Sequence, residues 1–191
     1  AFAQESYLFD ENMAVFYPEN FYPEGTLPSL SVIKEINYTE ALPAGWEIKP
    51  QYGTDDEGRV TVTIAYDDNV DLYGTGLVTG PLRRNGTDIQ LWNKDNWGYY
   101  GEDGKCLYQS HPWIMGVRPD GSSFGIIVDN TWRQYFELSN PIKITTEGPA
   151  FRVIVVEREN PYEMMKVLGE LTGKMELPPL WALGYQQSRF S

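Results

Sequence analysis

Residues 113–156, WIMGVRPDGSSFGIIVDNTWRQYFELSNPIKITTEGPAFRVIVV, decide the fold class. Five short runs rich in apolar, β-branched and aromatic residues lie in this stretch, at 113–117, 124–128, 132–138, 142–146 and 151–156. Turn residues separate the runs, and Pro119, Asp120 and Gly121 form the clearest turn. Short strands with turn signals every eight residues or so are typical of antiparallel sandwiches. We therefore predict an all-β fold, an antiparallel β-sandwich.

The same pattern continues toward the N-terminus. Residues 59–66 alternate between the apolar side chains of Val60, Val62, Ile64 and Tyr66 and a second face, as expected for a strand with one buried side. Residues 54–58, TDDEG, precede them and predict a hairpin turn. Shorter apolar runs at 13–17 and 30–36 predict two further strands.

One helix is predicted, over residues 161–172. Asn160 is a good N-cap, Pro161 suits the first helical position, and the charge of Glu163 suits the helix dipole. Gly173 stands where a left-handed αL cap is expected. The apolar residues follow helical spacing and form one stripe, Met164, Val167, Leu168 and Leu171.

The chain ends in residues 178–191, PPLWALGYQQSRFS. Its dense apolar run at 180–185 indicates a strand buried on both faces, followed by polar residues. A buried strand of this kind needs neighbours that this sequence does not provide. We therefore expect a chain cut where a larger domain begins, with a tail that is disordered, folded back on the sandwich or paired with another copy.

The terminal segment resembles the string that opens the catalytic barrel of glycoside hydrolase family 31, the α-glucosidase family. Residues 73–82, YGTGLVTGPL, resemble another stretch of that family, with Leu77 in place of its acidic residue. The helix ending in Leu171, Thr172 and Gly173 is also similar. The resemblance is clear from about residue 70 onward, and residues 1–69 are only compatible with it.

The resemblance implies a galactose mutarotase-like β-sandwich domain at residues 1–173, with the connecting helix at 161–172. Residues 174–191 would be the linker and first strand of a truncated (β/α)8 catalytic barrel. The whole protein would be a retaining α-glycosidase of the α-glucosidase type, acting on α-linked glucosides or related oligosaccharides. Such enzymes use two carboxylates about 5 Å apart. By resemblance both lie beyond Ser191, so we expect no catalytic residue and no glycosidase activity in this chain.

The long irregular stretch between residues 86 and 108 is the candidate substrate-binding loop. Trp92, Asn93, Lys94 and Asp95 resemble the aromatic-Asn-Arg-Asp element of the family loop that reaches over the barrel mouth, with Lys94 in place of Arg. The resemblance implies that Asp95 hydrogen-bonds the sugar, with Asn96 beside it and Trp97, Tyr99 and Tyr100 as stacking walls. The alternative is an Asx turn at Asp95 and Asn96 with Trp92 in the core.

Composition narrows the classes of partner and cofactor that the protein is expected to bind. The formal net charge of −12 argues against nucleic acid and anionic membranes, and no apolar run approaches the length of a membrane span. With one Cys, Cys106, and one His, His111, we expect no disulfide, no zinc and no cofactor. The clustered acids near Asp55 and Asp67 lack calcium-loop spacing. Any bridge between Asp129 and Arg133 would only stabilise a turn.

Three further expectations concern the whole protein. The domain should pack on its own catalytic barrel, with a homodimer as an alternative. The small-x-small start, Ala1, Phe2 and Ala3, resembles the end of a secretory signal and favours a periplasmic or secreted protein over a cytoplasmic one. The competing functions are a stand-alone carbohydrate-binding module, which would not need the terminal strand, and an aldose epimerase, which needs more than one His.

Overall fold

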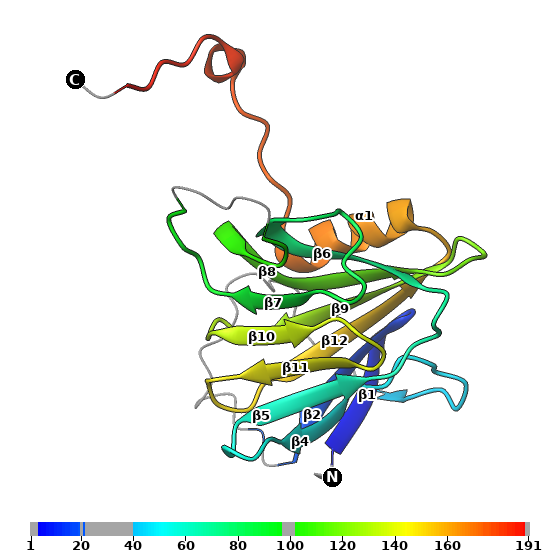
Figure 1. The fold of residues 1–191 in the computed structure, drawn as a ribbon. Helices are drawn as coiled ribbons and strands as arrows, with labels where there is room; N and C mark the ends of the chain where they lie inside the picture. Colours follow the sequence, from blue (N-terminus) through cyan, green and yellow to red (C-terminus); the bar gives the residue numbers. More distant parts are fainter. Residues whose placement is uncertain (1–3, 20, 22–39, 97–101, 190–191) are drawn as a thin grey trace.

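A computed structural model describes residues 4–19, 21, 40–96 and 102–189, and it forms a two-layer β-sandwich with one helix (Figure 1). The predicted fold class is therefore confirmed. The strands are β1 (Gln4–Asp10), β2 (Met13–Pro18), β3 (Glu40–Ala41), β4 (Gln51–Thr54), β5 (Val60–Ile64), β6 (Asp71–Val78), β7 (Asp88–Leu91), β8 (Cys106–Val117), β9 (Ser123–Asp129), β10 (Gln134–Glu137), β11 (Ile142–Thr146) and β12 (Arg152–Arg158).

The strands pair into two antiparallel sheets. A seven-stranded sheet has the order β3-β1-β2-β12-β9-β8-β6, and a five-stranded sheet has the order β4-β5-β11-β10-β7. The predicted hairpin at residues 54–58 joins β4 to β5, where Thr54 lies opposite Val60. Strands far apart in the chain become neighbours, since β12 lies between β2 and β9.

The centre of the seven-stranded sheet is buried on both faces, and β12 shows how the side-chain alternation achieves this. Val153 and Val155 point into the main core between the two sheets, together with Phe16, Phe124 and Phe136. Their neighbours Ile154 and Val156 point the other way, into a second cluster beneath the helix. Because successive side chains alternate across a strand, one run of valines and isoleucines serves two cores.

The second core is covered by α1 (Pro161–Thr172), whose bounds match the prediction. The Asn160 side chain accepts a hydrogen bond from the Glu163 N–H at 2.9 Å, which confirms the N-cap. Met164, Val167 and Leu171 are buried against β9 and β12, and Leu168 is partly buried. Gly173 has a φ of 89° but a ψ of 154°, so the predicted αL cap is wrong, although the positive φ still favours glycine.

The glycine-rich run that begins at Tyr73 lies largely in β6, an edge strand with two irregularities in its pairing to β8. Gly74 and Gly76 have φ values of 115° and 90°, and a Cβ at either would meet the backbone of β8. Residues after β6 fold back over its free edge. The buried Arg84 guanidinium donates to the carbonyls of Val78 at 3.2 Å and Pro81 at 2.7 Å.

Residues 174–189 extend away from the sandwich (Figure 1). The strand predicted at 180–185 is not formed here; the segment contains a short 3-10 helix, η2 (Leu180–Leu183), instead. A strand needs a hydrogen-bonding neighbour, and no described strand lies beside it. Its apolar side chains are exposed, among them Trp181 at 79%. The domain boundary at residue 173 and the barrel role of this segment stay predictions.

The N-terminal third differs most from expectation. β1 begins at Gln4, directly after the small-x-small residues that resemble the end of a secretory signal, and pairs with both β2 and β3. β3 is too short for an apolar pattern, and β4 contains only Tyr52 as a buried residue. The strand predicted at 30–36 lies outside the described residues.

Candidate functional site

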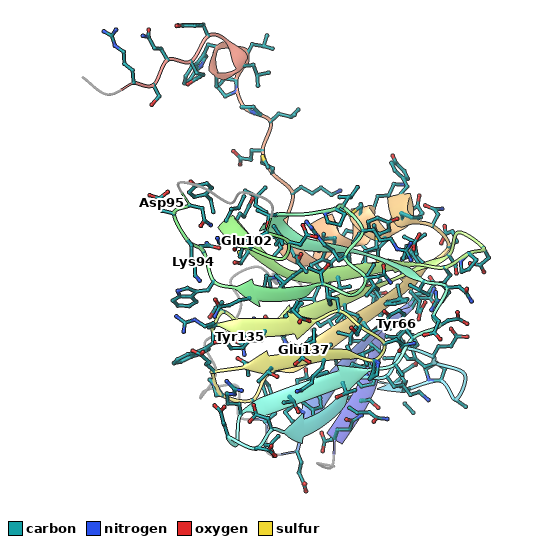
Figure 2. All side chains as sticks on the ribbon, viewed as in Figure 1. Tyr66, Lys94, Asp95, Glu102, Tyr135 and Glu137 are labelled. Atoms are coloured by element: carbon teal, nitrogen blue, oxygen red, sulfur yellow. The ribbon has the colours of Figure 1, made fainter. Side chains whose placement is uncertain are left out.

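The candidate site begins with the loop that leaves β7, which is tied along the start of β8. The Lys94 N–H donates to the Leu107 carbonyl at 2.8 Å, and the Asn96 side chain donates to the Cys106 carbonyl at 3.1 Å. Ser110 on β8 donates to the Asn93 side chain at 2.7 Å. Residues 93–96 are therefore held by a rigid strand. Figure 2 shows Asp95 on this loop, beyond Lys94.

Asp95, the predicted sugar ligand, is exposed. Its Oδ1 accepts a hydrogen bond from the Tyr108 hydroxyl at 3.1 Å, and the same hydroxyl donates to the Asn96 carbonyl at 3.3 Å. The Oδ2 atom has no hydrogen bond within the described residues. Tyr108 thus orients the carboxylate and leaves one oxygen available for a ligand. The side-chain bonds of Asp95 and Asn96 run to β8, whereas the Asx-turn alternative involves residue 97, outside the described residues.

Trp92 stands at the base of this loop and is 45% exposed, so the alternative that placed it in the core is wrong. The Arg133 guanidinium lies over its ring, 4.6 Å from the centroid. Arg133 also contacts both carboxylate oxygens of Glu147 at 3.4 Å. The ring is therefore held from one side by a cation that is itself anchored. Trp97, Tyr99 and Tyr100, the predicted stacking walls, lie outside the described residues.

Glu147 is the anchor of this arrangement. It accepts a hydrogen bond from the Tyr135 hydroxyl at 2.6 Å. That hydrogen bond, with a smaller contribution from Arg133, lowers the pKa of Glu147 below its ordinary value, against the opposing effect of desolvation. Tyr135 in turn accepts from Gln90, whose side-chain oxygen accepts from Lys94 at 3.2 Å. A polar chain therefore links the Asp95 loop to the β11–β12 turn.

A pocket of about 400 Å³ opens beside Trp92. It is assembled from three separate parts of the chain: the end of β7, the middle of β8 and the turn between β9 and β10. The lining residues are Leu91, Trp92, Asn93, Ser110, Pro112, Asn130, Thr131, Trp132 and Gln134. Sequence reasoning placed a turn near Asn130 and Thr131 and began a strand at Trp132, with no pocket there. The signal that could have pointed to the pocket is the polar Asn130 and Gln134 flanking an aromatic residue.

The structure also shows the surroundings of Asp129 and His111. The bridge considered between Asp129 and Arg133 does not form. Asp129 instead accepts from Arg152 on the adjacent β12 at 2.6 Å, because antiparallel pairing places these two residues opposite each other. His111 lies exposed on β8, and its ring makes no hydrogen bond within the described residues.

The acidic clusters show no arrangement for a metal. Within residues 4–19, 21, 40–96 and 102–189, no group of three or more His, Cys, Asp or Glu side chains could hold an ion. Asp55 accepts from the Arg59 side chain at 2.7 Å and from two backbone N–H groups of its own turn. Among the described helices none is long and apolar enough to span a membrane.

A comparison with protein-family models identifies the domain. Residues 11–137 match the glycosyl hydrolase 31 N-terminal galactose mutarotase-like domain. The chain belongs to this family. The match extends well into the N-terminal part, where the sequence alone was only compatible with the family. The two-sheet sandwich with its connecting helix is thus a galactose mutarotase-like domain of glycoside hydrolase family 31.

Curated relatives of this family 31 domain are much longer proteins. An α-glucosidase 2 of Bacillus thermoamyloliquefaciens is 37% identical over 138 residues, which are 71% of this chain and 17% of the relative. An α-xylosidase of Emericella nidulans is 29% identical over 117 residues, 59% of this chain and 14% of the relative. The chain therefore spans about a sixth of the length of these relatives.

Solved structures agree on the fold. A family 31 α-glucosidase of Bacteroides thetaiotaomicron is 46% identical, with a TM-score of 0.63, over 72% of this chain and 23% of that chain. The dextranase FjDex31A of Flavobacterium johnsoniae has a TM-score of 0.73 over 97% of this chain and 29% of that chain. At 18% identity the dextranase shows the shared fold alone.

Proposed function

We propose that this family 31 domain is the N-terminal accessory part of a retaining α-glycosidase that acts on α-linked glucosides or related oligosaccharides. The observation that carries the proposal is the match of residues 11–137 to the N-terminal domain of the family. Relatives named α-glucosidase and α-xylosidase support the substrate class. The domain would pack on a barrel of the longer protein, which would supply the two catalytic carboxylates.

In this proposal the domain contributes substrate contact through Asp95. A carboxylate can accept hydrogen bonds from two neighbouring hydroxyls, and hydrogen bonds to a charged acceptor are stronger than neutral ones. The Tyr108 hydroxyl fixes Oδ1 and leaves Oδ2 for the sugar. The bonds from Asn93, Lys94 and Asn96 to β8 hold the loop, so little ordering would be needed on binding.

The test replaces Asp95 in the longer protein. Asp95→Asn keeps the shape but removes the charge, and we expect kcat/KM for an aryl α-glucoside to fall by about tenfold or more. Asp56→Asn is the matched control, since Asp56 is an exposed carboxylate in the β4–β5 turn, at the opposite edge of the five-stranded sheet from β7. Unchanged kinetics in Asp95→Asn, with an unchanged melting temperature, would remove Asp95 from the site.

A second test separates the accessory role of this domain from catalysis by the rest of the longer protein. The 191-residue chain alone should not hydrolyse the aryl α-glucoside, because the chemistry is assigned to carboxylates outside it. Clear turnover by the purified chain, lost in none of the Asp95 variants, would contradict the accessory role.

A further inference from the structure

The pocket between Trp92 and Trp132 has the chemistry of a site for a neutral, hydroxyl-rich ligand. All nine described residues that line it are uncharged, although the chain as a whole is strongly acidic. Two of them are half-exposed tryptophans, at 45% and 44%. Five others carry amide or hydroxyl groups, Asn93, Ser110, Asn130, Thr131 and Gln134. Without a charged group the pocket does not suit phosphates, carboxylates or cations, whereas aromatic faces with amides suit a sugar ring.

Trp132 is held in its exposed position by two separate devices. Gly148, in the turn before β12, lies directly against the Trp132 side chain, and a Cβ there would overlap its Cβ, Cγ and Cδ1 atoms. The backbone N–H of Trp132 donates to the side-chain oxygen of Asn130 at 2.7 Å. The side-chain nitrogen of Asn130 donates in turn to the Thr146 hydroxyl at 3.0 Å. A large apolar ring left in water is unfavourable, so a turn built to keep it there points to a ligand that covers it.

The buried wall of the pocket contains an acceptor without a donor. Gln134 is 2% exposed, and its side-chain nitrogen donates to the Asn130 carbonyl at 2.6 Å, which fixes the orientation of the amide. Its Oε1 has no hydrogen-bond partner among the described residues and is shielded from solvent, so a ligand hydroxyl reaches it only when the pocket wall shifts. A buried acceptor left unpaired costs free energy that a hydroxyl donor would recover. Asn93 adds an exposed amide nitrogen, since its oxygen is occupied by Ser110.

We propose that this pocket is a second carbohydrate site, which binds one glucopyranose unit of a neutral α-glucan and does not depend on Asp95. The sugar ring lies with its C–H face on Trp132, and Trp92 bounds the other side. Gln134 and Asn93 supply an acceptor and a donor for ring hydroxyls. Asp95 is not among the lining residues, so the site goes beyond the proposed contact of the Asp95 loop. A covering protein segment, in place of a sugar, would leave the chain unable to bind free oligosaccharide.

The experiment titrates the isotope-labelled 191-residue chain with maltotriose and, separately, with isomaltotriose. Assigned indole N–H signals in heteronuclear NMR spectra report each tryptophan. We expect saturable shifts at Trp92 and Trp132 with a Kd of about 1 mM for at least one of the two sugars. Trp181, exposed on the C-terminal segment, should not shift. Glycerol, which offers hydroxyls but no ring face, should produce no saturable shift.

Variants locate the site. Trp132→Ala should weaken binding by about tenfold or more, and Gly148→Ala should do so without removing any pocket atom, because it displaces the ring. Trp181→Ala and Asp56→Asn should bind as the parent chain does. Spectral dispersion checks that each variant is folded, and Trp132→Phe should restore part of the affinity if Trp132→Ala is damaged.

Three results would overturn the site. One is the absence of saturable binding of either sugar up to about 20 mM. Another is unchanged affinity in both Trp132→Ala and Gly148→Ala. The third is loss of binding in Asp95→Asn with retention in Trp132→Ala, which would assign the sugar to the Asp95 loop instead. Kinetics of Asp95→Asn in the longer protein test the proposed function separately, so the two can fail independently.

Discussion

Trp113 and Trp132 lie in two regions of the molecule where the same feature, a glycine packed against a tryptophan ring, has opposite effects. Each ring lies against a glycine: Gly125 on β9 accommodates Trp113, and Gly148 accommodates Trp132. Trp113 is only 8% exposed, between the seven-stranded sheet and Met164 of α1, whereas Trp132 is nearly half exposed beside the pocket. The missing Cβ makes room for a ring in the core in one case and fixes a ring at the surface in the other.

The difference teaches how to separate stability from function in this domain. In the core, the ring is surrounded by apolar side chains, so changing either the ring or its glycine disturbs packing. At the pocket, the ring is open on one side, so it can move into water when its support changes. The same pair of substitutions should therefore act on the free energy of unfolding in one region and on ligand affinity in the other.

The largest effect is expected from Trp113→Ala. The variant leaves a cavity beneath α1 and should lower the free energy of unfolding by about 3–5 kcal/mol, measured by urea denaturation. Trp132→Ala is the matched control, and it should lower the same quantity by less than about 1 kcal/mol. Equal losses in the two variants would abolish the distinction between the two regions.

Gly125→Ala should come next. The added methyl would overlap the Trp113 ring and the Met164 sulfur, and both side chains are buried in the cluster under α1. Overpacking of this kind should lower the free energy of unfolding by about 1–3 kcal/mol, with a small offset from reduced flexibility of the unfolded chain. A variant as stable as the parent in urea would show that the core under α1 is loosely packed.

Gly148→Ala sharpens the comparison because it introduces the same atom at the surface. The Trp132 ring can swing outward, which relieves the overlap with Cγ and Cδ1 but not with Cβ, so the free energy of unfolding should fall by about 1 kcal/mol, less than in Gly125→Ala. Sugar affinity of the pocket should nevertheless fall. Gly125→Ala should mainly lower the free energy of unfolding, whereas Gly148→Ala should mainly lower sugar affinity. A strong loss of stability in Gly148→Ala would contradict this.

The smallest effect concerns the support of Trp92 through Glu147. Its folded pKa is depressed below the ordinary value of 4.5, so the stabilisation is present above that value and is lost as the pH falls through the folded pKa. Glu147→Gln should therefore be slightly less stable than the parent at about pH 7, and the gap should close at about pH 3. Urea midpoints at both pH values measure this, and a gap that widens in acid would give Glu147 a different role.

Much of the fold was predictable because local patterns determined it. The helix over 161–172 carried its cap, its stripe and its terminal glycine in the sequence, and the hairpins from 113 to 156 carried their turns. β1 and β3 were missed since their residues are mostly exposed or half-buried and show no clean alternation. The segment at 180–185 has the composition of a buried strand, but composition cannot provide the partner that a strand requires.

The candidate site was predictable only in part, for a geometric reason. The Asp95 loop is continuous in sequence, so its length and composition pointed to it. The pocket joins residues near 92, 110 and 132, and only the strand order and register bring those together. The role of Gly148 was equally invisible, because its neighbour Trp132 is on the other side of a hairpin. Arg133 likewise pairs with Glu147 across that hairpin and not with nearby Asp129.

Arg84 bears on how this domain behaves at high concentration, where copies of it can associate. An open sheet edge is a template for another chain, since its unpaired carbonyls and N–H groups can recruit a foreign strand. The carbonyls of Val78, at the end of β6, and of Thr79 and Pro81 just beyond it accept hydrogen bonds from one guanidinium, and two positive-φ glycines interrupt the ladder. We therefore expect this edge to be a poor template for pairing with another copy.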